Sequence, residues 1–172
     1  MKDSILTSHD SDYITVMTFK LIIMKTIKIL PPRIFQIALL TVALIHFLFP
    51  VWFIYDSPVR WFGLIPIIAG IYLNLYTDWL IKKFKTTIKP FEEPTSLIKK
   101  GPFSYSRNPI YLGMVLIVLG CSVLSGSLLA FFVPVALAFI IHYLYIIQEE
   151  VILEKNFGQK YQDYRNKVRC WL

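Results

Sequence analysis

The segment SRNPIYLG, residues 106–113, combines a guanidinium, a helix start and an aromatic ring within a few positions. Asparagine is among the best helix caps, and proline fits the first helical position, where no amide donor is required. Asn108 and Pro109 therefore predict that a helix begins here. The free backbone N–H groups of its first turn, the helix dipole and the neighbouring Arg107 together predict an anion-binding site.

A second group that could do chemistry is the acid pair Glu149 and Glu150. Adjacent residues of a helix point about 100° apart, so one carboxylate can face a helix bundle while the other faces water or a basic loop. A cleft with a cation and a helix N-terminus on one side and a carboxylate on the other suits a zwitterionic amino-acid group. We therefore predict that Arg107, Asn108 and the acid pair bind such a group.

Membrane helices must position these residues, because the composition is that of an integral membrane protein. Of 172 residues, 56% are hydrophobic and 17% charged, and the mean hydropathy is +0.57. Four stretches approach the roughly 20 apolar residues needed to cross a bilayer. They are residues 34–54, residues 61–81, and two that share residues 110–147 and are divided by a turn between Ser122 and Ser127. We predict an all-α bundle of four transmembrane helices, with a short third span and the last two spans forming a hairpin.

Basic residues indicate the orientation of this bundle, because cytoplasmic loops near the spans hold an excess of lysine and arginine. The connection between the second and third spans carries Lys82, Lys83, Lys85, Lys89, Lys99, Lys100 and Arg107. We therefore expect this loop and both termini to be cytoplasmic, in the bacterial inner membrane or an equivalent membrane. The net charge of +7 is then explained by anionic lipid headgroups as partners, and nucleic acid is not expected.

The two ends of the chain differ from the spans. Residues 1–33 are predicted to form a polar and interfacial N-terminal segment, preceding a single membrane domain at residues 34–172. One hypothesis is that the working protein starts at Met24. At the C-terminal end, an aromatic stripe at helical spacing predicts an amphipathic helix on the bilayer or over the bundle, with Gly158 as its joint to the last span. This stripe consists of Phe157, Tyr161, Tyr164, Val168 and Trp171.

The remaining polar residues within the spans suggest structural roles. Asp78 precedes Lys82 by four positions, which predicts an ion pair on one helix face. His46 and His142 are expected to pack within the bundle, although His142 lies near enough to the cytoplasmic end of the fourth span to reach a substrate. The cysteines have no partner at disulfide or metal-ligand spacing, so no metal site is expected.

SRNPIYLG, followed by EEVILEKNFGQKYQDYRNKVRCWL, resembles the C-terminal core of the isoprenylcysteine carboxyl methyltransferase and phospholipid methyltransferase superfamily. Members carry an Arg-His-Pro-x-Tyr-x-Gly motif and then a Glu-Glu pair before Phe-Gly-x-x-Tyr. The resemblance covers residues 90–172 and implies an integral membrane methyltransferase that uses S-adenosylmethionine. It implies a lipophilic or small acceptor, which could be a prenylcysteine-like carboxylate, a phospholipid amine or a thiol.

Carried over by position, the resemblance implies a cofactor site in which Glu149 meets the α-amino group. The implied cofactor-binding residues are Thr95, Ser96, Leu97, Ile98, Gly101, Phe103, Asn108, Pro109, Ile110, Tyr111, Glu149 and Glu150. We predict that Arg107, Tyr111 and Arg165 position the acceptor for catalysis.

Two positions depart from the family pattern. Asn108 stands where the motif has histidine, and asparagine cannot act as a base near neutral pH. Tyr145 stands four residues before Glu149, where the prenylcysteine enzymes place an arginine for the substrate carboxylate. The acceptor and the oligomeric state stay open, and so do two other functions. One is an NADPH-dependent membrane reductase of the sterol-reductase type, whose C-terminal core is similar, and the other is a nonenzymatic membrane scaffold.

Overall fold

The computed structural model describes residues 30–48, 58–86 and 94–172. Residues 1–29 of the predicted N-terminal segment, the Met24 start and the end of the first span at residues 49–54 lie outside these described residues. The predicted boundary at residue 33 was wrong, because residues 31–33 already belong to the helix of the first span. Residues 31–172 form one compact unit, so the described part of the membrane domain can be treated as a single structure.

Within the described residues, every element of regular secondary structure is helical. The α-helices are α2 (Pro31–Leu48), α3 (Leu64–Lys83), α4 (Pro109–Ser125), α5 (Phe132–Ile141), α6 (Ile147–Phe157) and α7 (Gln159–Lys167). The short turns are η1 (Val59–Gly63), η2 (Gly101–Ser104) and η3 (Leu128–Phe131), and the π-helical turn η4 (His142–Ile146) joins α5 to α6.

Three of these helical segments are long and apolar enough to cross a membrane, namely Pro31–Leu48, Val59–Lys83 and Leu128–Phe157. Helix α4 is a shorter apolar helix of 17 residues. The predicted helical bundle with a short third span is therefore confirmed. Leu40, Phe47, Ile68 and Leu75 are among the large apolar side chains that α2 and α3 expose, as helices that face lipid require.

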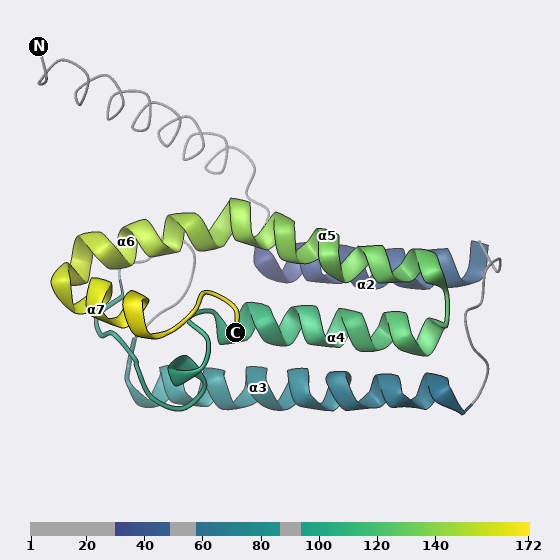
Figure 1. Cartoon of the computed structure of the whole chain (residues 1–172), viewed down its shortest axis with the longest axis horizontal. Helices are drawn as coiled ribbons and strands as arrows, with labels where there is room; N and C mark the ends of the chain where they lie inside the picture. The colour runs from purple at the N-terminus through teal and green to yellow at the C-terminus, as the bar shows by residue number, and fades with distance from the viewer. Residues whose placement is uncertain (1–29, 49–57, 87–93) are drawn as a thin grey trace, which may run out of the picture. The chain divides into compact units, whose positions relative to one another are not determined.

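Helix α4 lies at the centre of the bundle, between α3 on one side and α2 and α5 on the other (Figure 1). Its contact with α3 depends on glycines seven residues apart, because small residues let helix backbones approach closely. A Cβ atom added to Gly70 would lie 2.5 Å from Gly113 O, and one added to Gly63 would lie 2.5 Å from Gly120 O. The two backbones therefore touch at two levels, and no side chain fits between them.

The chain turns between α4 and α5 at the predicted cluster of serines and Gly126. Gly126 has a φ of +68° and ends α4 in the left-handed conformation. Ser122 Oγ donates a hydrogen bond to Ala130 O at 2.8 Å across the turn. His46 Nδ1 lies 3.2 Å from Ser125 O, so this histidine joins α2 to the turn in the expected packing role.

The predicted ion pair on α3 is also present, with Lys82 Nζ 2.5 Å from Asp78 Oδ2. Both side chains are largely exposed, which supports the structural role assigned to them.

The C-terminal helix is shorter than the aromatic stripe predicts. Gly158 has a φ of +51° and joins α6 to α7 as expected, but α7 ends at Lys167 and Val168 is extended. The helix does not reach Trp171, because the last residues turn back and pair with the loop before α4. Arg169 O accepts a hydrogen bond from the backbone N–H of Arg107 at 3.0 Å.

The buried side chain of Tyr164 anchors this returning tail by donating a hydrogen bond from Oη to Phe103 O at 2.6 Å. Burial raises the pKa of Tyr164 from 10.0 to about 12, although Arg107 acts in the opposite direction. The folded state thus holds the phenolic proton more tightly than the unfolded state. The resulting stabilisation is complete below the unfolded pKa and is lost as the pH rises from about 10 to about 12.

Tyr164→Phe is expected to lower the free energy of unfolding by about 1–3 kcal/mol near pH 8, because Phe103 O stays buried without its donor. The variant should also lose less stability than the wild type between pH 8 and pH 11.5, because it lacks the phenol whose pKa the fold raises. Both effects can be measured by equilibrium unfolding in detergent. Tyr105→Phe is the control, since Tyr105 is 76% exposed, and equal losses in the two variants would contradict the assignment.

Candidate active site

The candidate site is built where the loop before α4, the start of α4, helix α6 and the C-terminal tail meet. The loop is fixed to the end of α3 by apolar packing, since Ile98 and Phe103 form one buried cluster with Leu80 and Ile81. Ile110 packs against the same cluster. The segment implied to bind the cofactor is thus held rigidly beside the first turn of α4.

Polar contacts hold the earlier part of this segment as well. Thr86 Oγ1 accepts hydrogen bonds from the backbone N–H groups of Thr95 at 3.2 Å and Ser96 at 3.3 Å. Gly101 has a φ of +62°, and a Cβ atom there would lie 3.2 Å from Tyr76 Oη. The chain therefore passes close against α3 before it turns into α4.

Helix α4 begins at Pro109, with Asn108 as the residue before it, as predicted. The Asn108 side chain makes no capping hydrogen bond, so the expectation that it caps the helix was wrong. The amide is used elsewhere: Nδ2 donates to Cys170 O at 3.1 Å and to Cys170 Sγ at 3.5 Å. Asn108 thus joins the start of α4 to the returning tail.

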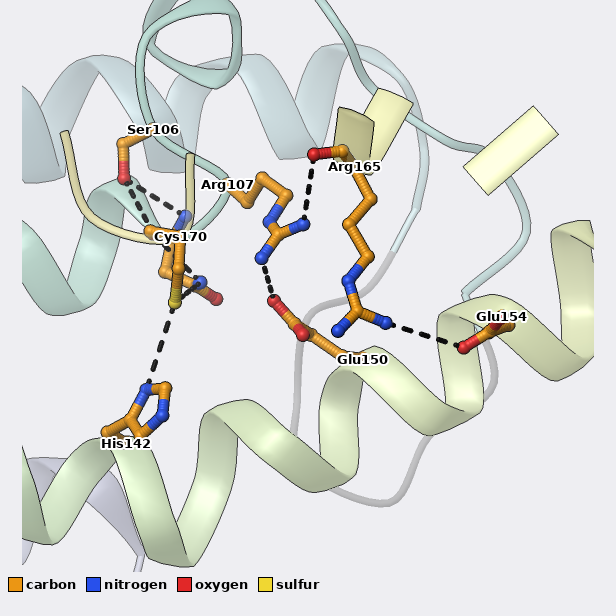
Figure 2. A network of polar contacts seen from close by, with 8 residues as sticks. Ser106, Arg107, His142, Glu150, Glu154, Arg165 and Cys170 are labelled. Atoms are coloured by element: carbon orange, nitrogen blue, oxygen red, sulfur yellow. Dashed lines mark hydrogen bonds and ion pairs between the residues drawn. The ribbon is translucent and has the colours of Figure 1, made fainter. Parts of the chain in front are cut away.

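Arg107 and Glu150 form an ion pair at the centre of the site, with Nη2 2.7 Å from Oε1. Their side chains are only 9% and 14% exposed. Arg107 Nη1 also donates to Arg165 O at 3.4 Å, and Figure 2 shows the guanidinium between Glu150 and the backbone of Arg165. The anion beside the helix start in this structure is therefore a carboxylate of the acid pair.

Glu149 points to the opposite side, toward the bundle. Its Oε1 accepts a hydrogen bond from Tyr111 Oη of α4 at 2.5 Å, and the buried Tyr111 ring lies 6.3 Å from that of Tyr145. The prediction that adjacent acids face different partners is confirmed. Arg107, Asn108, Tyr111 and the two glutamates come together from segments distant in the sequence.

Arg165, the third residue predicted to position the acceptor, lies on the exposed part of α7. Its Nη1 is 3.7 Å from Glu154 Oε2, and only its backbone carbonyl contacts Arg107. Its role in positioning an acceptor stays a prediction.

The contact between Cys170 and His142 was not predicted. Cys170 Sγ lies 3.8 Å from Nδ1 of His142, and Figure 2 marks this contact with a dashed line. Burial and then the charge of Glu150 raise the pKa of Cys170, against smaller opposing effects of Arg107 and Asn108. The thiol therefore keeps its proton near neutral pH. No spacing rule joins these two residues, because the tail must first fold back over α4.

An apolar cleft of about 720 Å³ lies between α4 and α5 and reaches His142 at one end. It is lined by Val115, Leu119, Phe131, Pro134, Val135, Ala138, Phe139, His142, Tyr143 and Trp171. The cleft thus runs along apolar helices and ends at His142. This histidine lies beside the polar cluster, a name used here for Arg107, Asn108, Tyr111, Glu149, Glu150 and Cys170.

The structure is thus a bundle of apolar helices of membrane-crossing length, with an ion pair and a hydrogen-bonded carboxylate near the start of α4. Comparison with protein families matches residues 58–160, more than half of the chain, to the family described as phospholipid methyltransferase. The chain belongs to this family, which is part of the isoprenylcysteine carboxyl methyltransferase-like superfamily. Family membership and the apolar helices together support an integral membrane methyltransferase.

One curated relative is a protein of Haemophilus influenzae (strain ATCC 51907 / DSM 11121 / KW20 / Rd) described as uncharacterized. It is 36% identical over 63 residues, which are 37% of this chain and 100% of the relative. No solved structure matches the chain.

Proposed function

We propose that the protein transfers a methyl group from S-adenosylmethionine to a lipophilic acceptor in the membrane. The observation that carries this proposal is the convergence of Arg107, Glu149 and Glu150 where the loop, α4 and α6 meet. The methionine part of the cofactor carries a carboxylate and an ammonium group. Arg107 suits the carboxylate, and Glu149 suits the ammonium group. Methyltransferases of this family generally use S-adenosylmethionine.

The unused hydrogen-bonding capacity of Arg107 supports this fit. Arg107 Nε is buried and has no hydrogen-bond partner among the described residues. A buried donor without a partner is costly, and an arginine has five N–H donors, so the guanidinium can bind a second carboxylate while it is paired with Glu150. Tyr161 Oη is likewise buried and without a partner in the described part of the chain. Both groups suit a polar ligand.

The acceptor is proposed to be a membrane lipid or another molecule with an apolar chain. The apolar cleft between α4 and α5 suits hydrocarbon, because ligand sites are mostly apolar with a few polar groups at one end. The excess of lysine and arginine in the loop before α4 and in the tail supports a cytoplasmic position for the charged residues of the site and for both termini. A lipid can then enter from the bilayer while the water-soluble cofactor arrives from the cytosol.

When bound, the cofactor supplies an electrophilic methyl group on a sulfonium sulfur. Methyl transfer is an in-line displacement, so the main tasks of the protein are to align donor and acceptor and to exclude water. Tyr111 holds Glu149 in place through its hydrogen bond. Arg107, Tyr111 and Arg165 are the residues proposed to position the acceptor.

Cofactor binding tests the proposal. Calorimetry of the detergent-solubilised protein with millimolar S-adenosylmethionine is expected to show saturable binding. Glu149→Ala should weaken it at least about tenfold, because the ammonium group loses its carboxylate. Asn108→Ala should weaken it too, since the tail is no longer joined to the start of α4. Glu154→Ala, which removes an acid from the same helix, is the matched control.

Absence of binding by the wild type, or an equal loss in Glu154→Ala, would overturn the proposal. Parallel thermal shifts distinguish the other functions. Stabilisation by NADPH alone would favour a membrane reductase, and stabilisation by neither cofactor would favour a scaffold.

A further inference from the structure

We propose that His142 accepts the proton that the methyl acceptor loses when it is methylated. This inference rests on the proposed methyl transfer and narrows the acceptor to a molecule that bears an amine or a thiol. A carboxylate acceptor is already deprotonated near neutral pH and would need no such group.

An amine or thiol acceptor has to release a proton, and the residues nearest the helix start are poorly placed to receive it. Asn108 cannot act as a base, and its amide is engaged with Cys170. The carboxylate of Glu150 is paired with Arg107, and that of Glu149 accepts the hydrogen bond of Tyr111. These side chains are thus already engaged with other groups, which favours a base elsewhere in the site.

His142 is in the right place to serve as this base. It lines the apolar cleft beside Trp171 and Tyr143, so an acceptor whose chain lies in the cleft brings its polar end to the imidazole. His142 also begins the π-helical turn η4, and π-helical turns within α-helices occur frequently at functional sites. Among the described residues of the cleft lining, it is the only histidine.

The tail fixes the orientation of the ring. Cys170 Sγ lies 3.8 Å from Nδ1 of His142 and accepts the side-chain hydrogen bond of Asn108. If Nδ1–H donates to the same sulfur, Nε2 keeps a lone pair for the incoming proton. Cys170 from the tail and Tyr143 on the same turn are the titratable groups that face the ring, and Arg107 and Glu150 act on Cys170 from the other side.

The proposed step moves one proton from the acceptor to His142 and one methyl group from the donor to the acceptor. The proton of the acceptor's ammonium or thiol group passes to Nε2 of His142, and the electron pair thereby left on nitrogen or sulfur forms the new bond to the methyl carbon. The electron pair of the breaking bond between the methyl carbon and the donor sulfur stays on that sulfur, which becomes a neutral thioether. The imidazolium then releases its proton to water at the mouth of the cleft.

The test compares His142→Gln with His46→Gln, which changes the other histidine of the described helices. Calorimetry should give wild-type affinity for S-adenosylmethionine in both variants. Transfer of a radiolabelled methyl group is then measured with phosphatidylethanolamine vesicles, dodecylamine and dodecanethiol from about pH 6 to pH 9. His142→Gln should lower the single-turnover rate by about 10²–10⁴-fold, the range for loss of a general base, and His46→Gln should leave it unchanged.

The pH profile distinguishes proton transfer from a structural role. The wild-type rate should rise with pH and then level off, as expected where a general base takes the proton. The rate of His142→Gln should keep rising, because only water and hydroxide can then take the proton. Imidazole in the buffer should partly restore the methyl-transfer rate of the His142→Ala variant. Dodecylamine should also protect His142, and not His46, from carbethoxylation by diethyl pyrocarbonate, a readout that needs no cofactor.

Several results would overturn the inference. One is a wild-type rate and pH profile in a His142→Gln protein that binds the cofactor normally. Another is a wild-type protein that binds the cofactor and methylates none of the three acceptors. Failure of the wild type to bind S-adenosylmethionine would instead overturn the proposed function, and the inference with it. If His142→Gln does not fold, His142→Asn takes its place in every measurement.

Discussion

Arg107→Leu is expected to lower the free energy of unfolding by about 3–5 kcal/mol, because it leaves the Glu150 carboxylate nearly buried and without its cation. The pair is well suited to such an effect, since its atoms are 2.7 Å apart and its side chains are only 9% and 14% exposed. Glu150→Leu should lower the free energy of unfolding by a similar amount. The double variant should lose less than either single variant, because an apolar pair of similar volume leaves no buried charge.

Equilibrium unfolding in detergent measures this cycle. Lys82→Leu is the matched control, since it breaks an ion pair whose side chains are 74% and 53% exposed. Surface pairs contribute about 0–1 kcal/mol. If Arg107→Leu lowered the free energy of unfolding by no more than Lys82→Leu does, the Arg107–Glu150 ion pair would not be the centre of the site.

Gly120→Leu is expected to separate α4 from α3 and to destabilise the protein by about 3 kcal/mol or more. A Cβ atom at this position would collide with Gly63 O and would lie 3.0 Å from Ile67 N. Backbone atoms cannot move aside as flexible side chains can. The whole helix would have to shift, and the start of α4 would move with it.

Thermal unfolding and cofactor titration of the same protein check this prediction. Ala136→Leu is the control, because it adds the same side chain at an exposed position of α5. A Gly120→Leu protein as stable as Ala136→Leu would show that the close contact between α3 and α4 is not required.

Local features of the sequence were sufficient to predict much of this fold. Apolar runs of membrane-crossing length predicted the helices, since length and composition are properties of each segment alone. The start of α4 at Pro109 follows from the restrictions that proline imposes on its neighbours. The divergence of Glu149 and Glu150 follows from the helical repeat, and their two partners, Tyr111 and Arg107, are consistent with it.

Long-range contacts could not be predicted in this way. The tail was expected to continue as a helix to Trp171, because its spacing is helical, but its carbonyl groups are needed by Arg107 and Asn108. The side chain of Asn108 was expected to cap its own helix, and it bonds instead to a residue 62 positions away. The glycine contacts of α3 and α4 depend on how the helices pair, which neither helix specifies by itself.

These long-range contacts also determine what the site can do. The returning tail brings Cys170 to His142 and Asn108, and so joins the polar cluster to the end of the apolar cleft. The family match covers residues 58–160, so Cys170 lies beyond the matched region, whereas His142 and Asn108 lie within it. The sequence indicated that His142 could reach a substrate, but its contact with Cys170 of the tail is visible only in the folded chain.

The most direct test of the proposed site is photolabelling of the purified protein with a radiolabelled, photoactivatable analogue of S-adenosylmethionine, followed by peptide mapping. Label is expected in peptides that contain residues 94–111 and residues 147–157, and an excess of S-adenosylmethionine should abolish it. Label confined to other peptides, or label that persists in the presence of the excess, would contradict a cofactor site formed by Arg107, Glu149 and Glu150.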